Sequence, residues 1–162
     1  MTRILSLFTA VVLMATLSVS AAPGPATAKA LAMVSGGGTA DFVATPNSVN
    51  TSGFTDFSIA ATVYDYGVAK GHFVCMVPAV VTISGDILSG TLNADGSVTL
   101  TGLAHGYDHF FQMAFSDLPF SVRLRAGGPG TGGFDYRDES GFFGPGQFDT
   151  EVVRRGMIMI GN

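Results

Sequence analysis

The chain has 162 residues and a net charge of −4, and 12% of its residues are charged while 47% are hydrophobic. This length suits one domain, with or without a processed segment, and the few charges beside many aromatic and β-branched residues exclude disorder over most of the chain. The acidic balance, without a basic cluster, argues against nucleic acid as a partner. A single cysteine excludes an internal disulfide and a cysteine-rich metal site.

The first 21 residues have the three parts of a secretory signal peptide. Arg3 supplies a positive charge, residues 4–19 are apolar apart from small hydroxyl residues, and small residues precede a cut after Ala21. The apolar run is shorter than the roughly 20 residues that a spanning helix needs. We therefore expect a secreted or periplasmic protein with no transmembrane segment after cleavage. Residues 22–33, rich in Ala and Pro, are expected to form a flexible tether, and residues 34–162 a single β-domain.

The sequence after residue 56 alternates apolar and polar residues, which is typical of strands with one buried face. The alternating segments are 57–64, 69–77, 81–87, 97–101, 120–125, 134–137 and 152–160. Turn signals separate them, and Asn93-Ala94-Asp95-Gly96 favours a tight hairpin because Asp-Gly readily takes positive φ values. About eight strands with short connections predict an all-β fold, a single antiparallel β-barrel or β-sandwich.

Cys75 is the one cysteine, and its place in the alternation predicts its role. It has the same parity as Phe73 and Val77, which predicts a buried, inert thiol. A nucleophilic pair with His72 is disfavoured, because residues three apart on a strand point to opposite faces. No catalytic residues are expected.

Three histidines are the candidate metal ligands. His105 and His109 lie close together in the sequence, and with His72 from another strand they would offer three imidazoles to zinc or copper. Same-face residues four apart on a strand are about 13 Å apart, so only a tight turn would bring the first two together. The other interpretation is a polar loop between Ala104 and Phe110, and we expect no metal and no cofactor.

Arg123 and Arg125 are the candidate anion-binding residues. They lie on the polar face of the strand at 120–125, about 7 Å apart, so their charges need compensation. A bound carboxylate or sulfate would supply it, as would a carboxylate before the last strand, for which Asp149 and Glu151 are the candidates. We expect carboxylates of the chain itself to do so.

Six segments together resemble a family of small secreted bacterial β-domains of uncharacterised function. The segments are VSGGGT at 34–39, GHFVC at 71–75, VTISG at 81–85, PFSVR at 119–123, GGPGTG at 127–132 and GMIMI at 156–160. The resemblance implies a single β-barrel or sandwich and an extracytoplasmic role. It carries over no catalytic residues.

These observations favour a non-catalytic surface module that is structural or binds a partner. Two alternatives remain, a small apolar-ligand carrier with a barrel cavity and a barrel isomerase. An open apolar interior would favour the carrier. A buried, perturbed carboxylate or histidine in a cleft would favour the enzyme.

Overall fold

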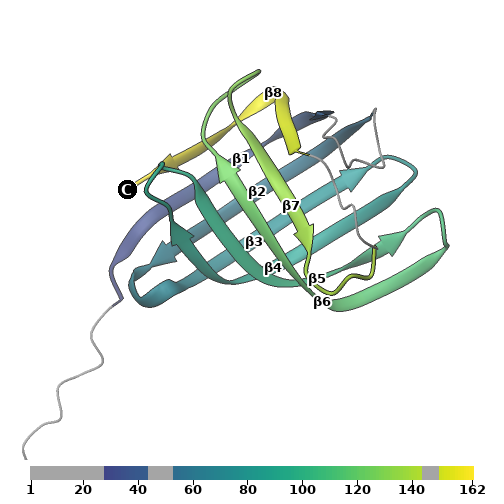
Figure 1. Cartoon of the computed structure of the whole chain (residues 1–162), viewed down its shortest axis with the longest axis horizontal. Helices are drawn as coiled ribbons and strands as arrows, with labels where there is room; N and C mark the ends of the chain where they lie inside the picture. Colours follow the sequence, from purple (N-terminus) through teal and green to yellow (C-terminus); the bar gives the residue numbers. More distant parts are fainter. Residues whose placement is uncertain (1–27, 44–52, 144–149) are drawn as a thin grey trace, which may run out of the picture.

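Eight antiparallel strands follow one another in chain order and close into a barrel, with the first strand paired to the last (Figure 1). The computed structural model describes residues 28–43, 53–143 and 150–162. The strands are β1 (Ala30–Val43), β2 (Phe54–Tyr64), β3 (Val68–Val77), β4 (Val81–Leu92), β5 (Val98–Asp108), β6 (Met113–Arg125), β7 (Gly133–Asp138) and β8 (Thr150–Gly161). A 3₁₀ turn, η1 (Asp65–Gly67), joins β2 to β3.

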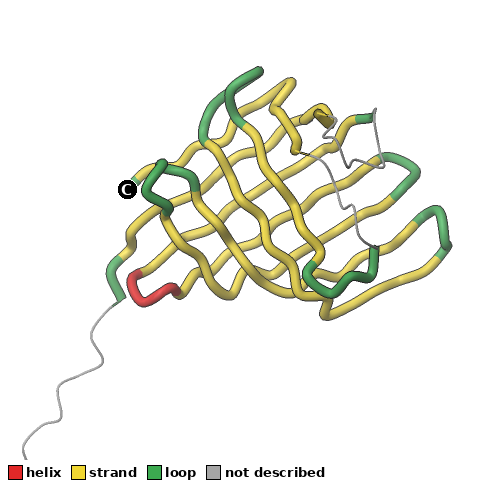
Figure 2. The backbone as a smooth tube through the Cα atoms, viewed as in Figure 1, coloured by secondary structure: helices red, strands yellow, loops and turns green. Residues whose placement is uncertain are grey.

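The predicted all-β class is confirmed, and strands make up most of the described chain (Figure 2). The residues described contain no helix long and apolar enough to cross a membrane. The expected signal peptide at 1–21 lies outside the described residues. β1 begins at Ala30, inside the segment 22–33 that was expected as a tether, because its residues pair with β2 on one side and β8 on the other.

The alternation predicted the buried faces of β2, β3 and β6. On β2, β3 and β6 the predicted inward residues are all buried: Phe57, Ile59, Ala61, Val63, Phe73, Cys75, Val77, Phe120, Val122 and Leu124. The hairpin at 93–96 is also confirmed, since the Gly96 amide donates to the Asn93 carbonyl at 3.0 Å and Gly96 has φ of 80°.

Aromatic rings fill the part of the barrel interior that the structure describes. Phe73 lies at the centre, with ring centroids 6.3 Å from Phe120, 5.7 Å from Phe134 and 6.0 Å from Tyr136. All four side chains are almost completely buried. Gly85 makes room for this cluster, because a Cβ atom there would lie 2.6 Å from the ring of Phe120. Rings packed this closely occupy the centre of the described interior.

β8 closes the barrel by pairing with β1 on one side and β7 on the other, and the two pairings differ in length. β1 pairs with β8 along most of its length, whereas β7 pairs with β8 only at Gly133 and Phe134. The loop before β7 continues this pairing, since the Gly130 amide donates to the Val153 carbonyl at 2.9 Å. The outer face of β5, β6 and β7 is one continuous surface, because β6 pairs with both of its neighbours. The end of the β5–β6 hairpin lies beside the chain that leaves β7 (Figure 1).

Candidate functional site

The hairpin between β5 and β6 presents two exposed aromatic rings at its tip. Phe110 and Phe111 are 78% and 70% exposed, and their ring centroids are 5.0 Å apart. The buried carboxylate of Asp108 holds the turn, because its Oδ1 accepts hydrogen bonds of 2.8 Å from both phenylalanine amides. A carboxylate that accepts bonds from the next backbone amides is a common means of fixing a turn. The exposed rings are therefore held on an ordered backbone.

A second aspartate organises the chain after β7 in the same way. The Asp138 carboxylate accepts bonds from the amides of Ser140 and Phe143, both at 2.9 Å. The Ser140 hydroxyl accepts a bond from the Phe142 amide at 3.1 Å. The rings of Phe142 and Phe143 are 5.0 Å apart, and each lies within 5.5 Å of the ring of Phe115. Phe115 is buried, so it connects this second aromatic pair to the core.

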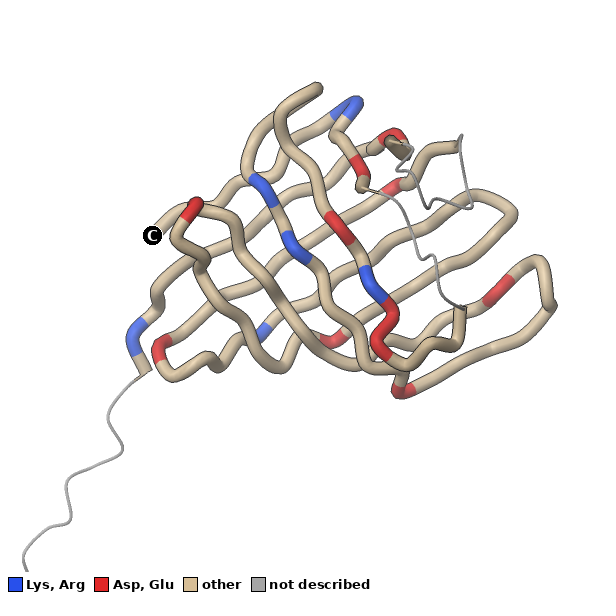
Figure 3. The backbone as a smooth tube through the Cα atoms, viewed as in Figure 1, with Lys and Arg blue, Asp and Glu red and all other residues tan. Residues whose placement is uncertain are grey.

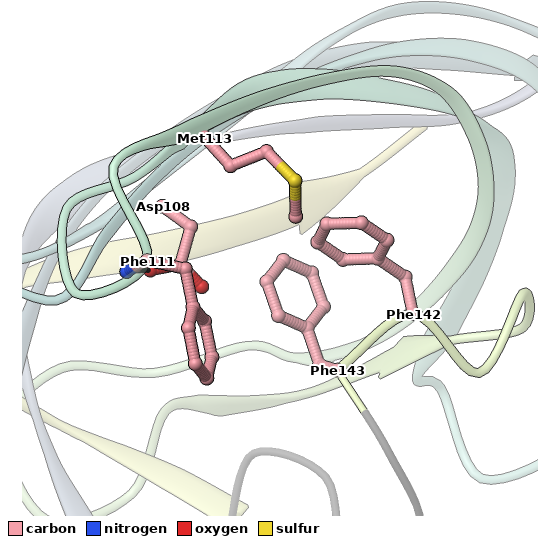
Figure 4. A pocket seen from close by; sticks show the side chains of 5 residues that line it. All are labelled: Asp108, Phe111, Met113, Phe142 and Phe143. Atoms are coloured by element: carbon pink, nitrogen blue, oxygen red, sulfur yellow. Dashed lines mark hydrogen bonds between the residues drawn. The ribbon is translucent and has the colours of Figure 1, made fainter.

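The two turns enclose an apolar pocket of about 270 Å³ at one end of the barrel. Its lining residues are Asp108, Phe111, Met113, Phe142 and Phe143. Figure 4 shows the Met113 thioether directed toward the rings of Phe142 and Phe143, with the Phe111 ring on the other side of Phe143. Because the one carboxylate in the lining is used by backbone amides, the pocket offers an incoming group mainly rings and a thioether.

Sequence reasoning missed this pocket, although a signal for it exists. Two adjacent phenylalanine pairs each follow an aspartate within five residues, in segments that do not alternate. Aspartate at a turn followed by two large apolar residues indicates apolar side chains held at a loop rather than in a strand. The pattern does not reveal that the two turns meet, because that depends on the barrel topology.

The three histidines considered as metal ligands lie on the outer face of β3 and β5 and just beyond the end of β5. His72 Nε2 is 2.8 Å from Ser84 Oγ, and His72 Nδ1 is 3.3 Å from Asp86 Oδ1. His109 Nε2 is 3.2 Å from Thr82 Oγ1. Within the described residues no three His, Cys, Asp or Glu side chains gather closely enough to hold a metal ion. His105 is on strand β5 and not in the polar loop that was expected.

The order Ser84, His72, Asp86 is that of a nucleophile, base and orienting acid. The setting differs from an enzyme site, however. The Asp86 side chain is 71% exposed and the imidazole 46% exposed, and neither described pocket is lined by any of the three residues. Water competes for exposed hydrogen bonds, and a flat sheet face has no cleft to position a substrate. We therefore interpret these residues as a hydrogen-bonded surface cluster.

Arg123 and Arg125 are compensated by carboxylates of the chain itself, as expected, and the partners are Asp95 and Asp135. Arg123 Nη2 is 2.6 Å from Asp95 Oδ2, and Arg125 Nη1 is 2.7 Å from Asp135 Oδ2. The expectation for Glu151 is wrong, because its side chain is fully buried and so cannot pair with an outward arginine. Asp149 lies outside the described residues.

Two ionisable groups of the interior influence each other. Burial, together with the charge of Glu151, raises the pKa of the Cys75 thiol well above its ordinary value. Burial also raises the pKa of Tyr136. Neither Cys75, Tyr136 nor Glu151 lines a described pocket. They are core groups, and the buried thiol that the sequence predicted is confirmed.

Comparisons with known proteins add no relative: no family model, no curated protein and no solved structure matches the chain.

Proposed function

We propose that this protein is a secreted or periplasmic, non-catalytic β-barrel that binds a protein partner through the aromatic pocket at the end of β5 and β6. The observation that carries the proposal is the placement of the rings. The central described rings fill the interior, whereas Phe110, Phe111 and Phe142 are exposed around one pocket. Exposed aromatic side chains gathered in this way are typical of interaction sites rather than of a bare surface.

The pocket's size and chemistry favour an apolar side chain of a partner as its occupant. A volume of about 270 Å³ is at the low end for a small-molecule site but ample for one large side chain. The exposed ring of Phe110 lies beside the pocket mouth and not in its lining, so it would add apolar contact area outside the pocket. A partner protein with one anchoring side chain would fill the pocket and also contact the Phe110 ring, whereas a free ligand of that size would only fill the pocket.

The carrier and isomerase alternatives receive less support. The carrier needs an open lumen, and the described interior is packed with aromatic rings. The isomerase needs an ionisable group in a cleft, and the buried Glu151 lines neither described pocket. The aromatic pocket itself presents rings, a thioether and an engaged carboxylate, which is a set suited to binding.

The pocket is tested with N-acetylphenylalaninamide, a soluble mimic of one aromatic side chain. The probe is titrated into the protein labelled with ¹³C at the methionine methyl groups, and the methyl NMR signals are followed. We expect a saturable shift of the Met113 signal, because this side chain lines the pocket, and little change for Met157 and Met159, which are exposed on β8. Equal shifts of all three signals, or no saturable shift of Met113, would contradict the proposal.

Two variants separate the pocket from general apolar exposure. Phe142→Ala removes one wall and should weaken probe binding by about tenfold, the equivalent of one well-packed aromatic contact. Leu88→Ala removes an exposed apolar side chain of β4 outside the pocket and should leave binding unchanged.

Residues 1–21 support the extracytoplasmic part of the proposal. Protein recovered from the periplasm or medium should begin at Ala22, as N-terminal sequencing would measure. Exported protein that still begins at Met1 would contradict it.

A further inference from the structure

A second pocket, of polar character, lies on the outer face of β5, β6 and β7. Its volume is about 250 Å³, and its lining residues are Thr99, Ser121, Arg123, Asp135, Arg137 and Glu139. The strand register explains why they gather. Thr99 is opposite Arg123, Arg123 is opposite Asp135, and Ser121 is opposite Arg137. Opposed residues are about 5 Å apart and alternate residues of one strand about 7 Å apart, so one small molecule can span the group.

Most of the charges on this face are neutralised by partners within the chain. Arg123 is held toward the 93–96 turn, because its Nη2 bonds to Asp95 and its Nε donates to Ser97 Oγ at 3.1 Å. Asp135 is paired with Arg125. Basic and acidic positions therefore lie side by side along β6 and β7 (Figure 3). These pairs leave little charge to attract a ligand.

Two charges of the lining have no ion-pair partner among the described residues. The Arg137 side chain is exposed, and within the described part of the chain its guanidinium forms neither a hydrogen bond nor an ion pair. Glu139 accepts a hydrogen bond from the Ser121 hydroxyl but is not neutralised by a cation in the same part of the chain. The pocket thus offers an available guanidinium and, two residues further on, a carboxylate that attracts hydroxyl donors.

We propose that this pocket binds a small hydroxycarboxylate of the sugar-acid class. The ligand carboxylate would bond to Arg137, whose planar fork of donors matches that group. The ligand hydroxyls would donate to Glu139 and exchange hydrogen bonds with Ser121 and Thr99. The negative charge of Glu139 disfavours compact anions such as sulfate, which carry charge and no donor. The site differs from the one expected from the sequence, since Arg137 replaces Arg125 beside Arg123.

The experiment is isothermal titration calorimetry with glucuronate on the full chain at physiological ionic strength, where weak surface attraction is screened. Glucose has the hydroxyls without the carboxylate, acetate has the carboxylate without the hydroxyls, and sulfate is a simple anion. Free alanine carries an ammonium in place of the hydroxyls. We expect glucuronate to bind at least about tenfold more tightly than glucose, acetate or sulfate, because each of these lacks either the carboxylate or the hydroxyl donors. We expect it to bind more tightly than alanine as well, because the alanine ammonium can reach Glu139 but alanine has no hydroxyls for Ser121 and Thr99.

Matched arginine variants locate the binding. Arg137→Ala should weaken glucuronate binding by about tenfold or more, and Ser121→Ala should weaken it by a smaller factor. Arg155→Ala is the control, because it removes another exposed arginine, which is on β8 and outside the pocket. Its binding should stay within about twofold of the unmodified protein.

Several results would overturn the proposal. Equal binding of acetate or sulfate would indicate a plain anion site, and equal binding of alanine would indicate a site for zwitterions. Equal binding of glucose would show that the arginine is not used. Equal losses in Arg137→Ala and Arg155→Ala would indicate non-specific attraction, and no detectable glucuronate binding would remove the site altogether.

Discussion

Replacing Phe73 by alanine tests whether the barrel is solid. The ring is fully buried and its centroid lies within 6.3 Å of three other rings, so its removal leaves a cavity at the centre of the interior. Buried Phe→Ala substitutions cost about 3–5 kcal/mol, and the loss of ring contacts places this one near the upper half of that range, at about 4 kcal/mol. The free energy of unfolding of a domain of this size is roughly 5–15 kcal/mol, so the variant should still fold but should be much less stable.

The assay is urea unfolding followed by far-UV circular dichroism, because the chain has no tryptophan. With an m-value of roughly 1.5 kcal/mol/M, the midpoint should fall by about 2.5 M. The control is Phe110→Ala, an exposed ring whose removal should change the free energy of unfolding by no more than about 0.5 kcal/mol. A loss below about 1 kcal/mol for Phe73→Ala would refute the packed interior and favour a hollow carrier.

Three further outcomes follow from the ionisable groups. Hydrogen bonds from Ser97 lower the pKa of Asp95 from 3.8 to about 2. The stability that these bonds add to the folded state is therefore fully present above pH 3.8 and is lost as the pH falls toward 2. A carboxyl ¹³C titration of Asp95 with a midpoint near 4 would contradict this. Cys75 should react with a thiol reagent only on unfolding, and Cys75→Ala should cost a few kcal/mol at most, whereas rapid labelling of native protein would place it outside the core. His105→Ala and His109→Ala should each leave the melting temperature unchanged with or without zinc; a zinc-dependent rise that either variant abolishes would establish a metal site.

The buried faces were predictable because they depend on a local rule. Side chains of a strand alternate between two faces, so the parity of Phe57, Phe73 and Phe120 was enough to place each inside. The hairpin before β5 was predictable for a similar reason, since Asp95-Gly96 encodes its own turn.

Features that depend on pairing between distant strands were not predictable. β1 contains Gly36, Gly37 and Gly38, which have no strand preference, and it forms because β2 and β8 hold it on both sides. β5 continues past His105 to Asp108 with its alternation of burial intact, but the buried positions there are Ala104 and Asp108, a small and a charged residue, which give no apolar signal in the sequence.

The candidate sites were harder to predict than the fold. The aromatic pocket joins Phe111 and Phe142, which are distant in the sequence and meet only once the barrel has closed. Glu151 occupies a position that parity alone leaves open at the start of β8, and its pairing opposite Phe134 directs it inward. Arg137 could not be singled out from the sequence, because its role depends on ion pairs that only the structure shows. Arg123 and Arg125 have carboxylate partners, whereas the Arg137 side chain has none within the described chain.

The central claim is that an apolar group binds at the end of the barrel and not inside it, and photo-crosslinking measures this directly. The protein is irradiated with a phenylalanine amide that carries a diazirine, and the labelled residues are identified by mass spectrometry. The structure predicts labels on Phe111, Met113 and the 142–143 segment, reduced by an excess of N-acetylphenylalaninamide. Labels on Phe73 or Phe120 would instead mean that the interior is the binding site and would contradict the account.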